Sequence, residues 1–331
     1  MIGGSSRSRR QTVFCVLFIL SALGLQGSPA LAQNPPSSIR SEIAGSPLIF
    51  DGYFIWASSA RSSTVSKLSP VDGRLLGSFP VGEAPLGLAS DGENIWVANS
   101  GDATVTKLRA SDGATLGVFE AGSKPVALLV VKDYVWVADQ DADAVRKIRA
   151  SDGHTVGIYG VGGSPTALAT DGENVWVLNH GSNSLTKLLA STGTSLGNFP
   201  AGDSPTSLVH DGSSLWVASD DYGIVLRLNP KDCKVLARYQ VADSASQIIF
   251  DKTNLWVSDR SKSGVVEIRP GDGMVLKLAP SVGQGEAMAY DGANLWIADG
   301  SRTYVAKLDG STGKIVGMYT LAGPSQKAGE N

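Results

Sequence analysis

The sequence predicts an all-β fold, a seven-bladed β-propeller with four antiparallel strands in each 40-residue repeat. Three observations support it: an even spacing of tryptophans, four β-rich runs in each interval between them, and recurring Asp-Gly pairs between the runs. The seven tryptophans are Trp56, Trp96, Trp136, Trp176, Trp216, Trp256 and Trp296. One large side chain per repeat is typical of packing between blades, and we interpret the tryptophans in this way rather than as a ligand-stacking ring.

The second repeat shows the strand pattern most clearly. Its β-rich runs cover residues 86–89, 95–98, 104–108 and 115–119. Asp91-Gly92 and Asp112-Gly113 lie between runs and suit tight hairpin turns, because Gly adopts positive φ and Asp caps the turn. No run keeps a 3.6-residue period over a helical length, and the Leu and Asn ladder of leucine-rich repeats is absent. Radially arranged four-stranded sheets are therefore the predicted architecture.

The first 32 residues differ in composition from the remainder of the chain. Three arginines precede an apolar run over 13–25, and Ala30-Leu31-Ala32 has the form of a cleavage site. We expect a secretory signal peptide over 1–32, a propeller over 45–321 and a C-terminal tail over 322–331. Residues 33–44 are either an N-terminal tail or a strand that closes the ring, because residues 314–319 also suit the last outer strand. The predicted location is secreted or periplasmic, with no stable membrane insertion after cleavage.

The net charge and the cysteine content argue against several classes of partner and site. Three of the 28 basic residues and none of the 31 acidic residues fall in 1–32, which leaves a formal charge of −6 on the expected mature chain. This charge argues against a nucleic-acid partner. Cys15 lies in the expected signal peptide, so Cys233 has no partner for a disulfide and no cysteine metal site is expected.

One phrase of the second repeat supports a family resemblance. Residues 82–92, followed by Ile95-Trp96-Val97-Ala98-Asn99 and residues 104–108, resemble the YVTN or YncE-like propeller repeats, and the likeness covers about residues 45–320. The resemblance implies a seven-bladed propeller in an exported protein, and many such proteins have no assigned activity. A function must therefore be argued from a site.

The same propeller group is similar to the virginiamycin B lyase-like propellers, whose enzymes use His and Glu with a divalent cation near the late blades. The three histidines here are His154, His180 and His210, and none falls in the last two repeats. Glu267 and Glu286 in those repeats have no neighbouring histidine. The chain thus departs from the lyase pattern.

Candidate ligand-binding residues lie in the loops after each second strand. The residue four after each Trp differs in every repeat, which suggests a surface that has diverged on a repeating scaffold: Ala60, Ser100, Gln140, His180, Asp220, Arg260 and Gly300. The candidate rim is Asp139, His180, Asp220, Asp221, Tyr222, Arg260 and Asp299. Loop capping by Asn, Asp and Ser is the alternative explanation. Gln247 and Glu286, in the inner strands, are second candidates that would face the central channel.

The expected function is non-catalytic binding of a protein, peptide or glycan through the loop face, with no cofactor and no assigned catalytic residue. The alternative is a metal-dependent lyase or lactone hydrolase. Asp139, Asp141 and Asp143 have the alternating spacing of a Ca²⁺ or Mg²⁺ site, although the Gly and distal Glu of an EF-hand loop are missing. A basic residue recurs in the third strands and is expected to form a solvated stripe without function: Lys67, Lys107, Lys147, Lys187, Arg227 and Lys307.

Overall fold

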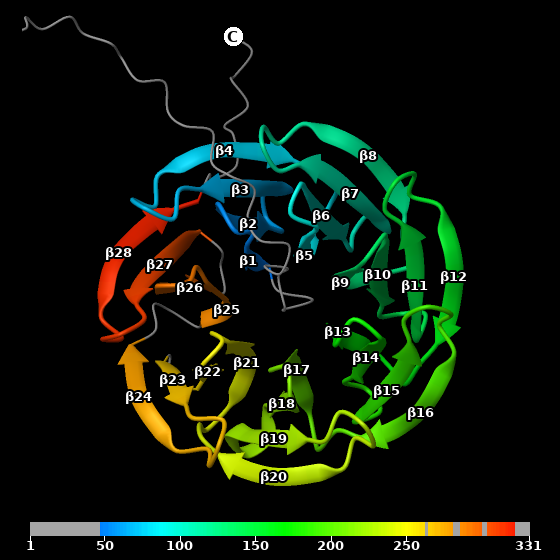
Figure 1. The fold of residues 1–331 in the computed structure, drawn as a ribbon. Helices are drawn as coiled ribbons and strands as arrows, with labels where there is room; N and C mark the ends of the chain where they lie inside the picture. Colours follow the sequence, from blue (N-terminus) through cyan, green and yellow to red (C-terminus); the bar gives the residue numbers. More distant parts are fainter. Residues whose placement is uncertain (1–46, 262–263, 281–284, 300–302, 322–331) are drawn as a thin grey trace, which may run out of the picture. The chain divides into compact units, whose positions relative to one another are not determined.

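The computed structural model describes residues 47–261, 264–280, 285–299 and 303–321. These residues form seven four-stranded antiparallel sheets that surround a central axis as the blades of a propeller (Figure 1). Each sheet uses four strands that are consecutive in the chain, with the first innermost and the fourth outermost. The predicted fold class is confirmed. The expected signal peptide and the segments 33–44 and 322–331 lie outside the described residues.

The first four blades contain strands β1 to β16, with these bounds: β1 (Leu48–Phe50), β2 (Ile55–Ser59), β3 (Thr64–Leu68), β4 (Leu75–Pro80), β5 (Pro85–Ser90), β6 (Asn94–Asn99), β7 (Thr104–Arg109), β8 (Thr115–Glu120), β9 (Pro125–Val131), β10 (Tyr134–Asp139), β11 (Ala144–Arg149), β12 (Thr155–Gly160), β13 (Pro165–Thr170), β14 (Asn174–Asn179), β15 (Ser184–Leu189) and β16 (Ser195–Pro200). The four runs predicted in the second repeat coincide with β5 to β8.

Blades five to seven contain the remaining strands and the 3₁₀ turn η1: β17 (Pro205–His210), β18 (Leu215–Ser219), η1 (Asp221–Gly223), β19 (Ile224–Leu228), β20 (Val235–Gln240), β21 (Ala245–Phe250), β22 (Leu255–Asp259), β23 (Gly264–Ile268), β24 (Val275–Pro280), β25 (Gly285–Tyr290), β26 (Asn294–Asp299), β27 (Tyr304–Asp309) and β28 (Ile315–Thr320). No helix in the described part of the chain is long and apolar enough to cross a membrane.

Each tryptophan is buried between two blades, as predicted. Trp96, for example, packs with residues of both β6 and β9–β10, including Leu128 and Val137. The Asp at the first turn holds the indole: Asp91 accepts hydrogen bonds from Asn94 N at 2.7 Å and from Trp96 Nε1 at 3.0 Å. The same Asp-to-indole bond occurs in the blades that contain Asp51, Asp211, Asp251 and Asp291. The recurring Asp-Gly turn therefore fixes the core as well as the hairpin.

The third-strand lysines correct an expectation from the sequence, because they are not a solvated stripe. Lys67, Lys147, Lys187 and Lys307 are buried. The Lys147 ammonium lies 5.3 Å from the Trp136 ring centre and donates to Ala190 O in the next blade at 2.8 Å. An ammonium cannot be buried without such partners, and carbonyls at the turn after the neighbouring third strand provide them. These lysines join adjacent blades.

The sixth blade achieves the same link with exchanged residues. Glu267 occupies the lysine position of β23 and is buried, whereas Lys277 comes from the outer strand β24. Lys277 Nζ lies 2.8 Å from Glu267 Oε2 and donates to Gly310 O of the seventh blade at 3.1 Å. Gly310 O corresponds to Ala190 O in the earlier blade. The sixth blade therefore keeps the hydrogen bond to the next blade, although its lysine comes from the outer strand.

The ring closes by packing between the first and seventh blades. Leu48 and Ile55 share a buried cluster with Trp296 and Val305. Lys307 adds the lysine link by donating to Pro70 O at 2.6 Å. The seventh sheet, β25 to β28, comes entirely from the last repeat, and its outer strand matches the run predicted at 314–319.

Candidate functional site

The blades display two loop faces with different chemistry. We call rim face the side formed by the loops between second and third strands and by the loops that join consecutive blades. We call turn face the opposite side, formed by the turns between first and second and between third and fourth strands. This division follows from the antiparallel order of the strands. All candidate loop residues belong to the rim face.

The residues three after each Trp lie beneath the rim rather than on it. All seven are at most 6 % exposed: Ser59, Asn99, Asp139, Asn179, Ser219, Asp259 and Asp299. Asp139 accepts from Ser123 N at 3.0 Å, Lys124 N at 2.9 Å and Arg146 Nε at 3.4 Å. Asp299 accepts from Thr303 N at 2.9 Å. Both carboxylates cap loops, because buried backbone N–H groups need acceptors there.

Two other rim candidates do meet, across the boundary between the fifth and sixth blades. Asp220 contacts Arg260 through Oδ2 and NH1 at 3.9 Å, and its Oδ1 accepts a hydrogen bond from Ser244 Oγ. Asp221, the next residue, accepts from Ser204 Oγ at 2.8 Å. Because both partners of the Asp220–Arg260 pair are well exposed, this pair adds little stability and leaves both charges accessible to a ligand.

Tyr222 projects beside these charges. Its side chain is 77 % exposed, and its backbone is left-handed, with φ of 62°. Gly223, the next residue, also has positive φ, of 56°. Left-handed backbone is unfavourable for a bulky residue, and such strain clusters at functional sites. A small pocket of about 90 Å³ lies next to Tyr222, lined also by Asp203, Asp221 and Arg238. We call Asp220, Asp221, Tyr222 and Arg260 the rim cluster.

His180 borders the rim cluster. It is exposed on the fourth blade, and its Nδ1 lies 3.0 Å from Pro205 O of the fifth. The Oγ of Ser204, the residue before Pro205, donates to Asp221.

The other candidates are separate from the rim cluster. His210 belongs to the turn face, where it stacks on Trp176 at 5.4 Å, and burial lowers its pKa. Gln247 is buried between the sixth and seventh blades, where its Oε1 accepts from Met288 N at 2.5 Å. The side chain of Glu286 lies outside the described residues.

The three aspartates with alternating spacing in the third blade each contact a different partner. Asp139 binds the loop amides described above, Asp141 lies 3.7 Å from Lys124 Nζ, and Asp143 accepts from Ser164 N of the next blade at 2.7 Å. Among the described residues, no three His, Cys, Asp or Glu side chains are grouped to hold a metal ion. A hard cation needs six or more oxygen ligands at about 2.3–2.6 Å for Ca²⁺.

We therefore expect the thermal unfolding midpoint of the purified protein to be the same with EDTA, with added Ca²⁺ and with added Mg²⁺. A ligand that binds only the native state raises this midpoint, and the stabilisation grows with the logarithm of the ligand concentration above its Kd. Differential scanning calorimetry measures it, with sodium chloride at matched ionic strength as the control. A midpoint that chelation lowers and one cation restores would contradict the expectation and support the metal-dependent alternative.

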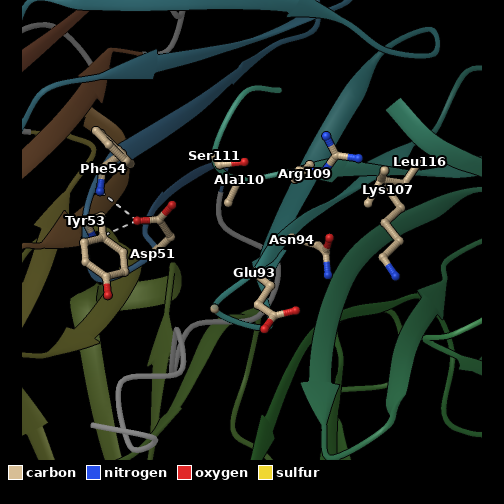
Figure 2. A pocket seen from close by; sticks show the side chains of 11 residues that line it. Asp51, Tyr53, Phe54, Glu93, Asn94, Lys107, Arg109, Ala110, Ser111 and Leu116 are labelled. Carbon is tan, nitrogen blue, oxygen red and sulfur yellow. Dashed lines mark hydrogen bonds between the residues drawn. The ribbon is translucent and has the colours of Figure 1, made fainter. Parts of the chain in front are cut away.

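A larger pocket lies on the turn face, between the first and second blades, where the sequence predicted no site. Its volume is about 600 Å³. Figure 2 shows Tyr53 and Phe54 at one side and Arg109, Lys107 and Leu116 at the other. The first turn reads Asp51-Gly52-Tyr53-Phe54, whereas the second and fourth repeats have Asp-Gly-Glu-Asn. This departure from the repeat is the feature of the sequence that could have indicated the pocket.

Comparison with known proteins supports the fold. No family model and no curated protein matches the sequence. A streptogramin B lyase structure superposes with a TM-score of 0.65 at 17 % identity, over 78 % of this chain and 91 % of that one. A functionally unknown protein from Desulfotomaculum acetoxidans DSM 771 gives 0.71 at 14 %, over 81 % and 95 %. The computationally designed Ika8 protein gives 0.63 at 16 %, over 86 % and 89 %. At these identities the likeness concerns the fold alone.

Proposed function

We propose that this protein is a non-catalytic binding module that acts outside the cytoplasm and engages an extended polypeptide segment through the rim cluster. The observation that carries the proposal is Tyr222, an aromatic side chain held exposed on left-handed backbone beside accessible charges of both signs. Exposed Tyr and Arg are the residue types that most often dominate protein interfaces. The arginine-rich start of the chain, with its apolar run, supports export.

The chemistry of the rim cluster fits a peptide. Asp220, Asp221 and Arg260 can pair with both kinds of charged side chain and with backbone amides. The pocket of about 90 Å³ next to Tyr222 is large enough for a small side chain. In several blades the residue three after the tryptophan is used by internal hydrogen bonds. The divergent rim residues are therefore the part of this face that is best placed to determine a partner.

The lyase alternative has less support. The similarity to the streptogramin B lyase structure is at 17 % identity, which does not transfer a reaction. Among the described residues His180 is not grouped with two other His, Cys, Asp or Glu side chains that could hold a metal ion, and no histidine falls in the last two repeats. We therefore retain binding as the proposed function.

Selection from a phage-displayed random peptide library tests this proposal. We expect peptides selected on the wild-type protein to lose at least about tenfold in affinity for the Tyr222→Ala/Arg260→Ala variant, because these two residues are the exposed anchors. Calorimetric melting confirms that the variant remains folded. Tyr53→Ala on the turn face is the matched control and should bind normally. Selected peptides that bind the double variant as tightly as the wild type would contradict the proposal, as would a library that yields no binder.

A further inference from the structure

We infer that the pocket between the first and second blades on the turn face is a second binding site, and that its ligand is a neutral oligosaccharide. The site lies on the face opposite the rim cluster and shares no residue with it, so it is independent of the proposed function. Its volume of about 600 Å³ is within the range of small-ligand sites.

The walls of this pocket are fixed before any ligand binds. Phe54 is backed by the Lys67 ammonium, which lies 3.8 Å from the centre of its ring. The same ammonium crosses the blade boundary and donates to Ala110 O at 2.7 Å and Ser111 O at 2.9 Å, two residues that line the opposite wall. The turn that carries Tyr53 is held by Asp51, whose Oδ1 accepts from Tyr53 N at 2.8 Å and Phe54 N at 2.7 Å (Figure 2). Such preorganisation favours affinity.

The charged groups around the pocket balance one another in sign. Lys107 donates to Ala150 O at 2.8 Å, and Arg109 pairs with Asp112 at 2.9 Å. The carboxylate of Asp51 accepts from its own turn and from Trp56. The side chains of Arg109 and Asp112 are about half exposed, so their pair is weak and leaves guanidinium N–H groups accessible to hydroxyl groups. Glu93 adds one exposed carboxylate to the lining. With one exposed group of each sign, the pocket has no excess charge that would select an ionic ligand.

The remaining lining matches a polyhydroxylated chain. Glu93, Asn94 and Ser111 offer donors and acceptors along one side, which hydroxyl groups can satisfy. Tyr53, Phe54 and Leu116 offer apolar surface, which the C–H face of a sugar ring can cover. A purely apolar ligand would leave the polar groups unsatisfied at a cost. A sugar presents both hydroxyl groups and apolar C–H faces, and the pocket lining has both kinds of partner.

Comparison among the repeats shows that this lining is not a general property of the blades. At the position of Tyr53 the later repeats carry Glu93, Asp133, Glu173, Ser213, Thr253 and Ala293. The boundary between the second and third blades keeps the basic residue and the aliphatic residue, as Arg149 and Val156, but faces them with Glu93 and Asn94 instead of two aromatic rings. The third repeat keeps a single ring, Tyr134, at the position of Phe54. The pair of rings therefore distinguishes the first boundary.

Isothermal titration of the purified protein with maltohexaose, cellohexaose and N-acetylchitohexaose, all three uncharged, tests the inference. We expect saturable binding of at least one of them, and a loss of about tenfold or more in Tyr53→Ala. Arg149→Ala is a matched control for Arg109→Ala, since Arg149 makes the same ion pair with Asp152 at 2.8 Å but lines no part of this pocket. We expect Arg109→Ala to weaken binding and Arg149→Ala to leave it unchanged.

Three results would overturn the inference: no binding of any of these sugars up to about 10 mM, equal binding by Tyr53→Ala, or binding of a pool of uncharged pentapeptides in place of the sugars. Tyr222→Ala separates the two proposals, because it should weaken binding of rim-selected peptides and leave oligosaccharide binding intact. A negative result for one binding site therefore leaves the proposal for the other site to its own test.

Discussion

Lys277→Gly is expected to lower the free energy of unfolding by about 3 kcal/mol or more, because it leaves a buried carboxylate without its counter-ion. Glu267 is 4 % exposed, and its Oε2 lies 2.8 Å from Lys277 Nζ. The substitution also removes the donor to Gly310 O, the link between the sixth and seventh blades. The second carboxylate oxygen keeps Asn254 Nδ2 at 2.8 Å, which does not neutralise the charge.

The double variant Glu267→Lys/Lys277→Gly should recover most of this loss. It restores the arrangement of the first, second and seventh blades, where Lys67, Lys107 and Lys307 lie opposite Gly77, Gly117 and Gly317. Glu267→Lys alone should be destabilising, because it places two ammonium groups together. Urea denaturation of the four proteins gives the coupling energy. Additive single effects would show that the ammonium position is not what joins these blades.

Gly153→Val is expected to cost about 3 to 5 kcal/mol of stability, because a β-branched residue adds overpacking to backbone strain. Gly153 has φ of 73°, and a Cβ there would collide with the ring of Phe119 in the preceding blade. The structure contains a natural variation at this position: Cys233 replaces the glycine in the fifth blade with φ of 54°. There, Trp176 stacks on His210 instead of an outer-strand ring.

Gly172→Val is the matched control for the glycine experiment. Gly172 has φ of 91°, but no atom lies within 4 Å of the position that a Cβ would take, so the cost is mainly backbone strain of about 1–3 kcal/mol. Thermal or urea unfolding measures both variants. Equal losses in the two would mean that contact between the third-to-fourth turn and the neighbouring aromatic ring is not a packing constraint.

The repeat itself made the scaffold predictable. Trp spacing and Asp-Gly turns depend on local rules, so β5 to β8 and the last outer strand could be located from residues alone. The links made by the third-strand lysines could not be predicted. Alternation along a strand does not show that the carbonyl of Ala190 or Pro70 lies within hydrogen-bonding distance in the next blade. The Glu267–Lys277 exchange depends on pairing between strands, as Glu267 lies opposite Lys277 in β24.

The candidate site was predictable in part. Divergence between repeats identified the exposed positions Asp220 and Arg260, which the structure brings together. It did not separate them from Asp139 and Asp299, because polar residues at strand ends serve equally as exposed ligands and as buried caps. The turn-face pocket was missed since its aromatic wall and its basic wall come from different blades, and only the fold places Tyr53 near Arg109.

Hydrogen exchange of the protein with and without a rim-selected peptide tests the central claim most directly. The binding account predicts slower amide exchange in the loops at 180–183, 220–223 and 260–261, with the turns at 51–54 and 109–116 unchanged. Protection confined to the turn face, or a bound peptide that leaves the loops around Tyr222 exchanging at their free rate, would contradict it.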